Sequence, residues 1–135
     1  MMNRRHFVKM MGLTALAPLA PALMQEKPAQ RRVFLVETHI AGFYYYDGMV
    51  DRVYDQLRVG ERLRLRREPG NPYDHNAIEI YTLAGNKLGY VPRAVNEIPA
   101  ALLDQDLPLR AEISRVDAEM DEWNPVDFRL FLLWN

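Results

Sequence analysis

The 135-residue chain has no cysteine. This absence excludes disulfide bonds, thiolate metal sites, lipid attachment through cysteine and cysteine nucleophiles. The sequence also lacks a Gly-x-Ser-x-Gly elbow, a Walker loop and any recognisable pair of catalytic carboxylates. Only three histidines are present, and their positions do not have the spacing of metal ligands. We therefore expect a non-enzymatic protein with no metal and no cofactor.

A strong excess of one charge is also missing. The chain carries 17 basic and 18 acidic side chains. Without residues 1–22, which hold three basic residues and no acid, the balance becomes 14 to 18. Proteins that bind nucleic acid by charge alone are usually strongly basic, so any such binding here must use a local patch. With 49% hydrophobic residues, the chain can bury one core, which indicates a single domain.

The N-terminus has the layout of an export signal. A basic start is followed by an apolar run, Met10 to Leu19, and by the small-residue triplet Ala20-Pro21-Ala22. The run is shorter than the about 20 residues that span a membrane. The order of Arg4-Arg5, an apolar pair and a lysine resembles the twin-arginine signal, which predicts export by that machinery to the periplasm or cell envelope. The expected organisation is a signal peptide over 1–22, a linker over 23–32 and one domain over 33–135.

The hydrophobic pattern of the domain is mainly that of strands. Alternation in the first of them places Phe34, Val36, Thr38 and Ile40 on one face. About six strands with closely spaced turns predict a small, partly open β-barrel capped by a helix. The expected strands cover residues 33–40, 61–66, 77–83, 86–91, 107–116 and 126–135.

Two short helices are expected beside the strands. The first is a short amphipathic helix that contains Val50, Val53, Tyr54 and Leu57 and ends near Gly60. The second is capped by Asn96 and runs to about Gln105, with inward-facing side chains at Ile98, Leu102 and Leu103. In the preceding run of four aromatics, residues 43–46, alternation alone would bury two of the rings.

The strand over residues 61–66 alternates strictly between leucine and arginine. Leu63 and Leu65 are expected to face the core, whereas Arg62, Arg64 and Arg66 form an outward row. Such a row can hold phosphates. It is equally typical of an ordinary solvated sheet face.

The next loop, NPYDHNAI over residues 71–78, is unusually polar for a turn. Asx turns by Asn71 and Asp74 would explain it structurally, and we expect Asn71, Pro72 and Asn76 to shape the fold. In a binding role, Tyr73 and Asp74 would point into a cleft. The Asp74 carboxylate accepts hydrogen bonds and suits a sugar 3′-hydroxyl, whereas a 3′-phosphate would be repelled.

The segments AGFYYYDG, LRVGERLRLRREPGNPYDHNAIEIY and KLGYVPR, in this order, resemble the HIRAN domain over about residues 33–135. The resemblance implies an OB-like barrel. In characterised eukaryotic relatives, this barrel captures the 3′ end of single-stranded DNA by stacking aromatic rings on terminal bases. A tyrosine and an aspartate contact the terminal sugar.

The resemblance also implies roles for single residues. Tyr45 matches a stacking tyrosine, Tyr73 and Asp74 match the pair at the sugar, and Arg93 stands near the phosphates. Tyr44 occupies the place of an arginine and Tyr90 that of a histidine, so two hydrogen-bonding groups differ. The candidate ligand-binding residues are Tyr44, Tyr45, Tyr73, Asp74, Tyr90, Arg93, Arg62, Arg64 and Arg66.

Three functions fit these observations. The first is a module that binds single-stranded DNA ends. The second is an exported envelope protein whose barrel cleft binds a protein, a peptide or an oligosaccharide, as OB-type barrels also bind sugars. The third is a structural envelope protein whose cleft is vestigial.

Overall fold

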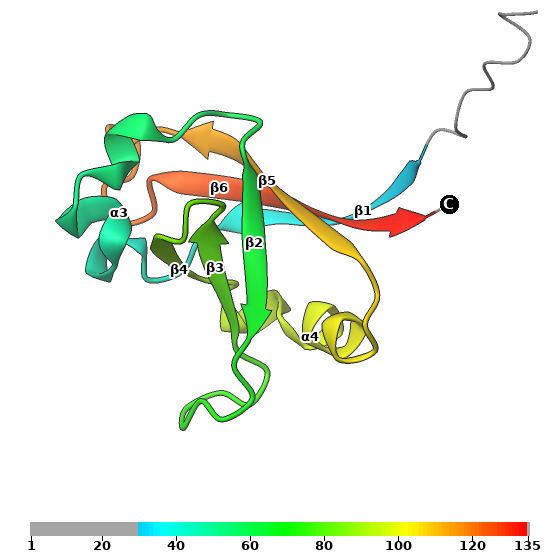
Figure 1. Cartoon of the computed structure of the whole chain (residues 1–135). Helices are drawn as coiled ribbons and strands as arrows, with labels where there is room; N and C mark the ends of the chain where they lie inside the picture. Colours follow the sequence, from blue (N-terminus) through cyan, green and yellow to red (C-terminus); the bar gives the residue numbers. More distant parts are fainter. Residues whose placement is uncertain (1–29, 135) are drawn as a thin grey trace, which may run out of the picture.

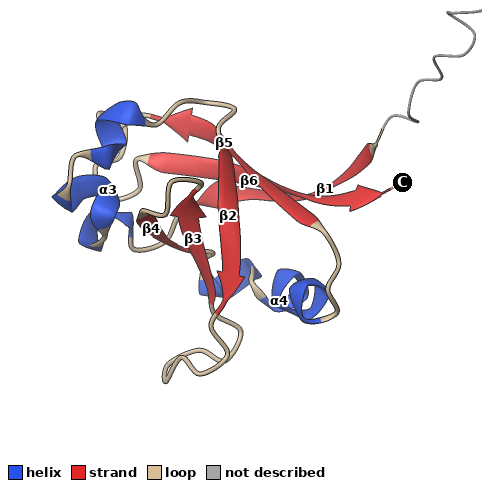
Figure 2. Ribbon diagram, in the orientation of Figure 1, coloured by secondary structure: helices blue, strands red, loops and turns tan. Residues whose placement is uncertain are grey.

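The computed structural model describes residues 30–134, which form one antiparallel six-stranded sheet with few helices (Figures 1 and 2). The strand order is β1-β6-β5-β2-β3-β4. The expected OB-like, partly open barrel is confirmed, whereas the expected signal peptide lies outside the described residues. The strands are β1 Arg31–His39, β2 Arg62–Arg67, β3 Ile78–Thr82, β4 Lys87–Tyr90, β5 Leu109–Val116 and β6 Val126–Trp134. The helices are η1 Phe43–Tyr45, α3 Asp47–Val50, η2 Val53–Gln56, η3 Arg93–Val95 and α4 Glu97–Asp104.

The barrel closes at one point only, between the edge strands β1 and β4. Just after β1, Ala41 exchanges two backbone hydrogen bonds with Tyr90, of 2.8 and 3.0 Å. Gly89 allows this approach, because a Cβ atom there would collide with the carbonyl oxygen of Ala41. The pairing then stops, since the chain passes through Pro92, which has no N–H, into η3. Beyond this bridge the barrel remains open.

The inward row of β2 is confirmed. Leu63 is buried and Leu65 packs against the core, while the three arginines of the row are exposed. The core forms where the two halves of the curved sheet face each other. Its largest fully buried apolar side chains are Phe43, Phe128, Ile40, Ile78, Ile80, Leu88, Ile113 and Leu130.

The first strand departs from simple alternation. Its pairing with β6 slips between Phe34 and Val36, which makes Leu35 an extra residue in a bulge. Val36 and Ile40 share the core face, but Phe34 lies on the outer face, half exposed, with its ring centroid 6.0 Å from that of Phe131. The prediction for Phe34 was wrong because a bulge reverses the alternation, which a period of two cannot show.

The prediction of a single helix near residues 50–57 was also wrong in detail. Two short pieces, α3 and η2, replace it, because Arg52 between them has a left-handed backbone with φ of 59°.

No helix in the described part of the chain is long and apolar enough to cross a membrane.

The first three residues of the run of four aromatics form the 3₁₀ helix η1. Phe43 is therefore buried and both Tyr44 and Tyr45 are exposed, a result that alternation did not predict. The second helix, α4, is present where it was expected, and Leu103 packs against the core. Ile98 was expected to face inward but is 68% exposed.

Candidate functional site

Three exposed aromatic side chains of the barrel, Tyr44, Tyr45 and Trp123, lie together in a group that we call the aromatic ledge. The ring centroids of Tyr44 and Trp123 are 4.6 Å apart, and those of Tyr45 and Trp123 are 6.4 Å apart. Tyr45 is 71% exposed and Trp123 is 53% exposed. Trp123 was missed by the sequence reasoning, although a tryptophan in an acidic surface loop is a signal in itself. The ledge offers flat apolar faces to solvent.

The loop between β5 and β6 holds Trp123 in place. The Asp121 carboxylate accepts the backbone N–H groups of Trp123 and Asn124, each at 3.1 Å. Arg115 forms a two-pronged ion pair with Asp127 and also donates to the carbonyl oxygen of Asn124 at 2.7 Å. These contacts fix the backbone of the loop on both sides of Trp123, and the position of the indole ring follows from that backbone.

The NPYD loop is a rigid turn built on Asn71. The side-chain oxygen of Asn71 accepts the backbone N–H groups of Tyr73 and Asp74, at 2.8 and 3.1 Å. Its amide donates to Glu68 at 2.8 Å. The expected Asx turn is thus present. Tyr73 does not point into a cleft, because its side chain is 83% exposed at the tip of the loop.

Asp74 is anchored through both of its carboxylate oxygens. One accepts the backbone N–H of Asn76 at 2.9 Å and the other accepts the side-chain amide of Asn96 at 2.8 Å. Partial burial opposes ionisation, but these two hydrogen bonds and the positive charge of Arg93 outweigh it and lower the pKa of Asp74. The fully buried Asn96 therefore supports Asp74 and does not cap α4 with its side chain, contrary to the expectation. Asn76 contributes through its backbone N–H.

A chain of polar contacts connects this loop to β4. The Tyr90 hydroxyl donates to Glu68 at 2.7 Å and accepts from the Lys87 ammonium at 2.9 Å. Lys87 also pairs with the almost buried Glu79 at 3.0 Å. We call these four residues the β4 network. Because its hydroxyl is already engaged on both sides, Tyr90 presents a ring and not a free hydrogen-bonding group.

The β4 network shifts the ionisation of its members. Burial and the bond to Glu68 outweigh the effect of Lys87 and raise the pKa of Tyr90 to about 12. The pKa of Lys87 is raised as well, because hydrogen bonds to Tyr90 and Glu79 outweigh its desolvation. Hydrogen bonds from Asn71 and Tyr90 lower the pKa of Glu68. At neutral pH Glu68 is therefore a carboxylate, Lys87 an ammonium and Tyr90 a neutral phenol.

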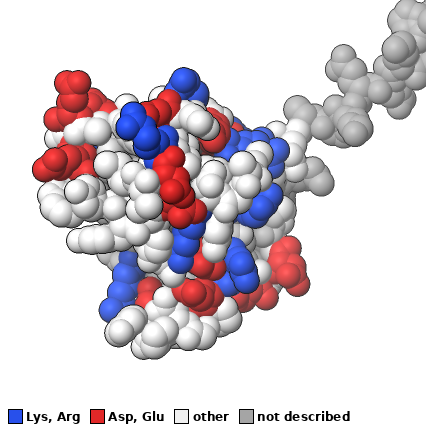
Figure 3. All heavy atoms as spheres, turned by 60° about the vertical axis from the view of Figure 1, so that its left-hand side comes forward, with Lys and Arg blue, Asp and Glu red and all other residues white. Residues whose placement is uncertain are grey.

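The arginine row is not a purely basic stripe. Arg64 donates to the carbonyl oxygen of Leu83 at 3.3 Å, and Arg66 lies 3.8 Å from Glu79. Figure 3 shows basic and acidic side chains interspersed on the side of the molecule where α3 lies. Arg93 is exposed on η3 and acts on Asp74 through its charge. Phosphate contacts on this face would have to compete with carboxylates.

The structure links several of the candidate residues in one series of contacts. The series starts at Tyr46, which follows Tyr45 of the aromatic ledge in the sequence. The ring centroids of Tyr46 and Tyr90 are 5.9 Å apart. It continues through Tyr90, Glu68 and Asn71 to the backbone of Tyr73 and Asp74. Within residues 30–134, no hydrogen bond, ion pair or aromatic contact connects Arg62 or Arg64 to this series, and no three histidine or acidic side chains form a metal-binding group.

Solved structures with the same architecture are known. A protein from Lactobacillus plantarum superposes with a TM-score of 0.68 at 33% identity, covering 79% of this chain and all of that one. The crystal structure of the HIRAN domain of human HLTF superposes with a TM-score of 0.60, covering 77% of this chain and 80% of that one. At 20% identity, the latter likeness shows the fold alone.

Sequence relatives are much longer proteins. Helicase-like transcription factor of Oryctolagus cuniculus is 36% identical over 69 residues, which are 51% of this chain and 6% of that protein. A putative SWI/SNF-related regulator of chromatin from Arabidopsis thaliana, subfamily A member 3-like 1, is 30% identical over 91 residues, or 65% of this chain and 10% of that protein. The likeness is therefore confined to one domain of these relatives. A family model described as the HIRAN domain matches residues 33–134, and the chain belongs to this family.

Proposed function

We propose that this HIRAN domain is a non-enzymatic module that binds the 3′ end of single-stranded DNA. The observation that carries the proposal is the aromatic ledge, whose exposed rings can stack on unpaired bases. Stacking on an aromatic side chain contributes about 1–3 kcal/mol per base and tolerates any sequence. The likeness to helicase-like transcription factors supports a DNA ligand.

The NPYD loop would receive the terminal sugar. Each oxygen of Asp74 accepts one hydrogen bond from the protein, and a carboxylate oxygen can accept a second. A 3′-hydroxyl can donate to it, whereas a 3′-phosphate would bring a second negative charge to a carboxylate that stays ionised. Tyr73 stands exposed at the same turn and can cover the sugar.

The test is fluorescence anisotropy of the full chain with labelled single-stranded oligonucleotides that end in a 3′-hydroxyl or a 3′-phosphate. We expect tighter binding of the 3′-hydroxyl form. Trp123→Ala should weaken binding of both forms about 5- to 150-fold. Met120→Ala is the matched control, because Met120 is an exposed apolar residue of the same loop, and it should change nothing. Equal affinity for the two ends would overturn the 3′-end assignment, and equal behaviour of the two variants would overturn the role of the ledge.

A second candidate is an envelope binder of a protein, a peptide or an oligosaccharide. It is favoured by the carboxylate of Glu79, which pairs with Lys87 and Arg66, two cations that phosphates would need. Phosphate contacts give a steep salt dependence of affinity, and sugar or apolar contacts do not. Binding that is indifferent to salt would therefore favour this candidate over DNA.

We also propose export by the twin-arginine route, on the basis of Arg4-Arg5 and the small-residue triplet that ends at Ala22. Replacing both arginines by lysine should leave the full-length precursor in the cytoplasm. Cell fractionation and immunoblotting provide the measurement. Unchanged export of the double-lysine variant would contradict the proposal.

A further inference from the structure

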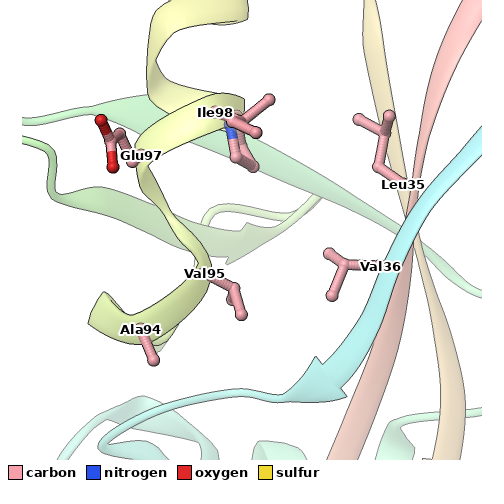
Figure 4. A pocket seen from close by; sticks show the side chains of 7 residues that line it. Leu35, Val36, Ala94, Val95, Glu97 and Ile98 are labelled. Carbon is pink, nitrogen blue, oxygen red and sulfur yellow. The ribbon is translucent and has the colours of Figure 1, made fainter.

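The open side of the barrel contains an apolar groove of about 370 Å³, within the size range of ligand pockets. One wall is the bulged part of β1, with Leu35 and Val36, and the other is formed by η3 and α4, with Val95 and Ile98. Figure 4 shows these two sets of side chains on opposite sides of the groove. None of the lining residues belongs to the aromatic ledge, the NPYD loop or the β4 network.

An unpaired strand edge runs along this groove. Among residues 30–134, β1 pairs only with β6, so its second edge is free beyond the bridge from Ala41 to Tyr90. Backbone groups alternate between the two edges of a strand. Because Ile40 bonds to β6 and Ala41 to β4, the N–H and C=O groups of Glu37 and His39 point to the free edge. The backbone pairing that begins between Ala41 and Tyr90 is therefore not continued along β1 by any described strand.

Charges near the two ends of β1 complement an extended peptide that runs in one particular direction along the strand. A strand that continues the direction of β4 would run antiparallel to β1, from His39 towards Arg31. It would start beside Glu37, which is exposed and forms a partly exposed ion pair with Arg129 at 3.4 Å. It would end beside the exposed Arg31, which has no ion pair with any described residue. The complementary segment carries a basic residue near its start and an acidic residue near its end, with apolar residues alternating between them.

We propose that this groove binds an extended peptide of that composition, which adds a strand to the free edge of β1 and places its apolar side chains against Leu35 and Ile98. The volume of the groove suits a few side chains of one strand and not a second barrel. The bulge at Leu35 also favours a peptide over a second copy of the barrel, because bulges on edge strands disfavour pairing between two identical edges. A flexible peptide can follow the bulge.

The probe is the peptide Lys-Val-Thr-Val-Ser-Leu-Glu-amide, labelled with fluorescein at its N-terminal amine so that the lysine side chain keeps its charge, and titrated with the full chain. Seven extended residues reach about 23 Å, which is comparable to β1. We expect saturable binding. A peptide with the two charged residues exchanged should bind more weakly. A peptide N-methylated at alternate residues, on the edge that would pair with β1, should bind at least about tenfold more weakly, because it loses the backbone donors.

Two variants of Glu37 separate the ladder from the charge. Glu37→Pro removes an N–H that points away from β6, a place where edge strands tolerate proline, and should lower affinity at least about tenfold relative to Glu37→Ala. Ile98→Asp should also weaken binding, since it places a charge in the groove. All three variants should bind oligonucleotides as the unaltered chain does, so failure of this proposal is distinguishable from failure of DNA binding.

Three results would overturn the proposal. The first is absence of saturable peptide binding at about millimolar protein, the weak limit of specific recognition. The second is equal binding of the N-methylated peptide, or equal affinity of the two Glu37 variants. The third is a concentration-dependent dimer in sedimentation experiments that Glu37→Pro abolishes, because the occupant of the edge would then be a second copy of this chain.

Discussion

The NPYD loop and the aromatic ledge expose their side chains in opposite ways. In the loop, the polar groups of Asn71 and Asp74 are bound to the protein itself. In the ledge, Tyr45 and Trp123 lie largely in solvent and are held through their backbones. The loop is ordered by its polar side chains, and the ledge keeps its side chains available.

This difference separates stability from binding. A buried polar group that loses its partner costs free energy of unfolding, whereas removal of an exposed ring leaves the fold unaffected. Substitutions in the loop should therefore act mainly on stability. Substitutions in the ledge should act mainly on affinity for a ligand.

The largest effect is expected for Asp74→Ala, which leaves the buried amide of Asn96 without its acceptor. The free energy of unfolding should fall by about 2–3 kcal/mol, as measured by urea denaturation. Asp55→Ala is the control, because Asp55 forms only an exposed ion pair with Arg52, and it should stay within about 0.5 kcal/mol. A similar small change for Asp74→Ala would contradict the anchoring role of the loop.

Tyr45→Ala should show the opposite behaviour. Loss of one stacking face should weaken binding of single-stranded oligonucleotides by about 1–2 kcal/mol, or roughly 5- to 30-fold. The urea midpoint should not move, since the ring is mostly in solvent. If the variant lost stability but kept its affinity, the division between loop and ledge would be wrong. Val50→Ala, an exposed apolar residue outside the ledge, serves as the control.

Glu68→Gln tests how the β4 network supports the loop. Hydrogen bonds to the carboxylate lower the pKa of Glu68 below its ordinary value of 4.5. Their contribution is therefore complete above that value and is lost as the pH falls through the lower, folded-state pKa. The variant should be less stable by about 1 kcal/mol at neutral pH, and the difference should shrink between about pH 5 and pH 3. Thermal unfolding over this range is the measurement, with Glu119→Gln as an exposed control. A constant difference would exclude a role for the Glu68 charge.

Arg64→Ala should have the smallest effect, because Arg64 is exposed and lies outside the series of contacts. If the arginine row holds phosphates, the slope of log affinity against log salt should fall by about 1. The preference for a 3′-hydroxyl should not change. Arg52→Ala, a similarly exposed arginine in the linker between α3 and η2, should leave the slope unaltered. An unaltered slope in Arg64→Ala would mean that the row is only a solvated face.

The fold was largely predictable because its strands have clear periods. The alternation of β2, the hairpin of β3 and β4 and the position of α4 all follow from local patterns. Three of the errors share one cause, since single backbone departures changed the local period. The bulge at Leu35, the left-handed Arg52 and the 3₁₀ turn at Tyr44 each depend on tertiary packing.

The candidate site was predictable in part. The motif indicated Tyr73 and Asp74, and the Asx turn indicated that the loop would be rigid. The support of Asp74 by Asn96, 22 residues away in sequence, had no local signal. For Trp123 the only local signal was a tryptophan in an acidic loop, because its contacts with Tyr44 and Tyr45 bridge almost 80 positions of the chain.

Local sequence patterns were enough to indicate the family, the six strands and the turn chemistry of the NPYD loop, because alternation, Asx turns and glycine positions act over a few neighbouring residues. Which groups remain available to a ligand depends on the folded arrangement of the chain. In the folded chain the hydroxyl of Tyr90 is hydrogen-bonded to Lys87 and Glu68, Trp123 lies against the tyrosines of η1, and one edge of β1 is unpaired among the described residues. These outcomes depend on contacts between distant segments, which a local pattern does not encode.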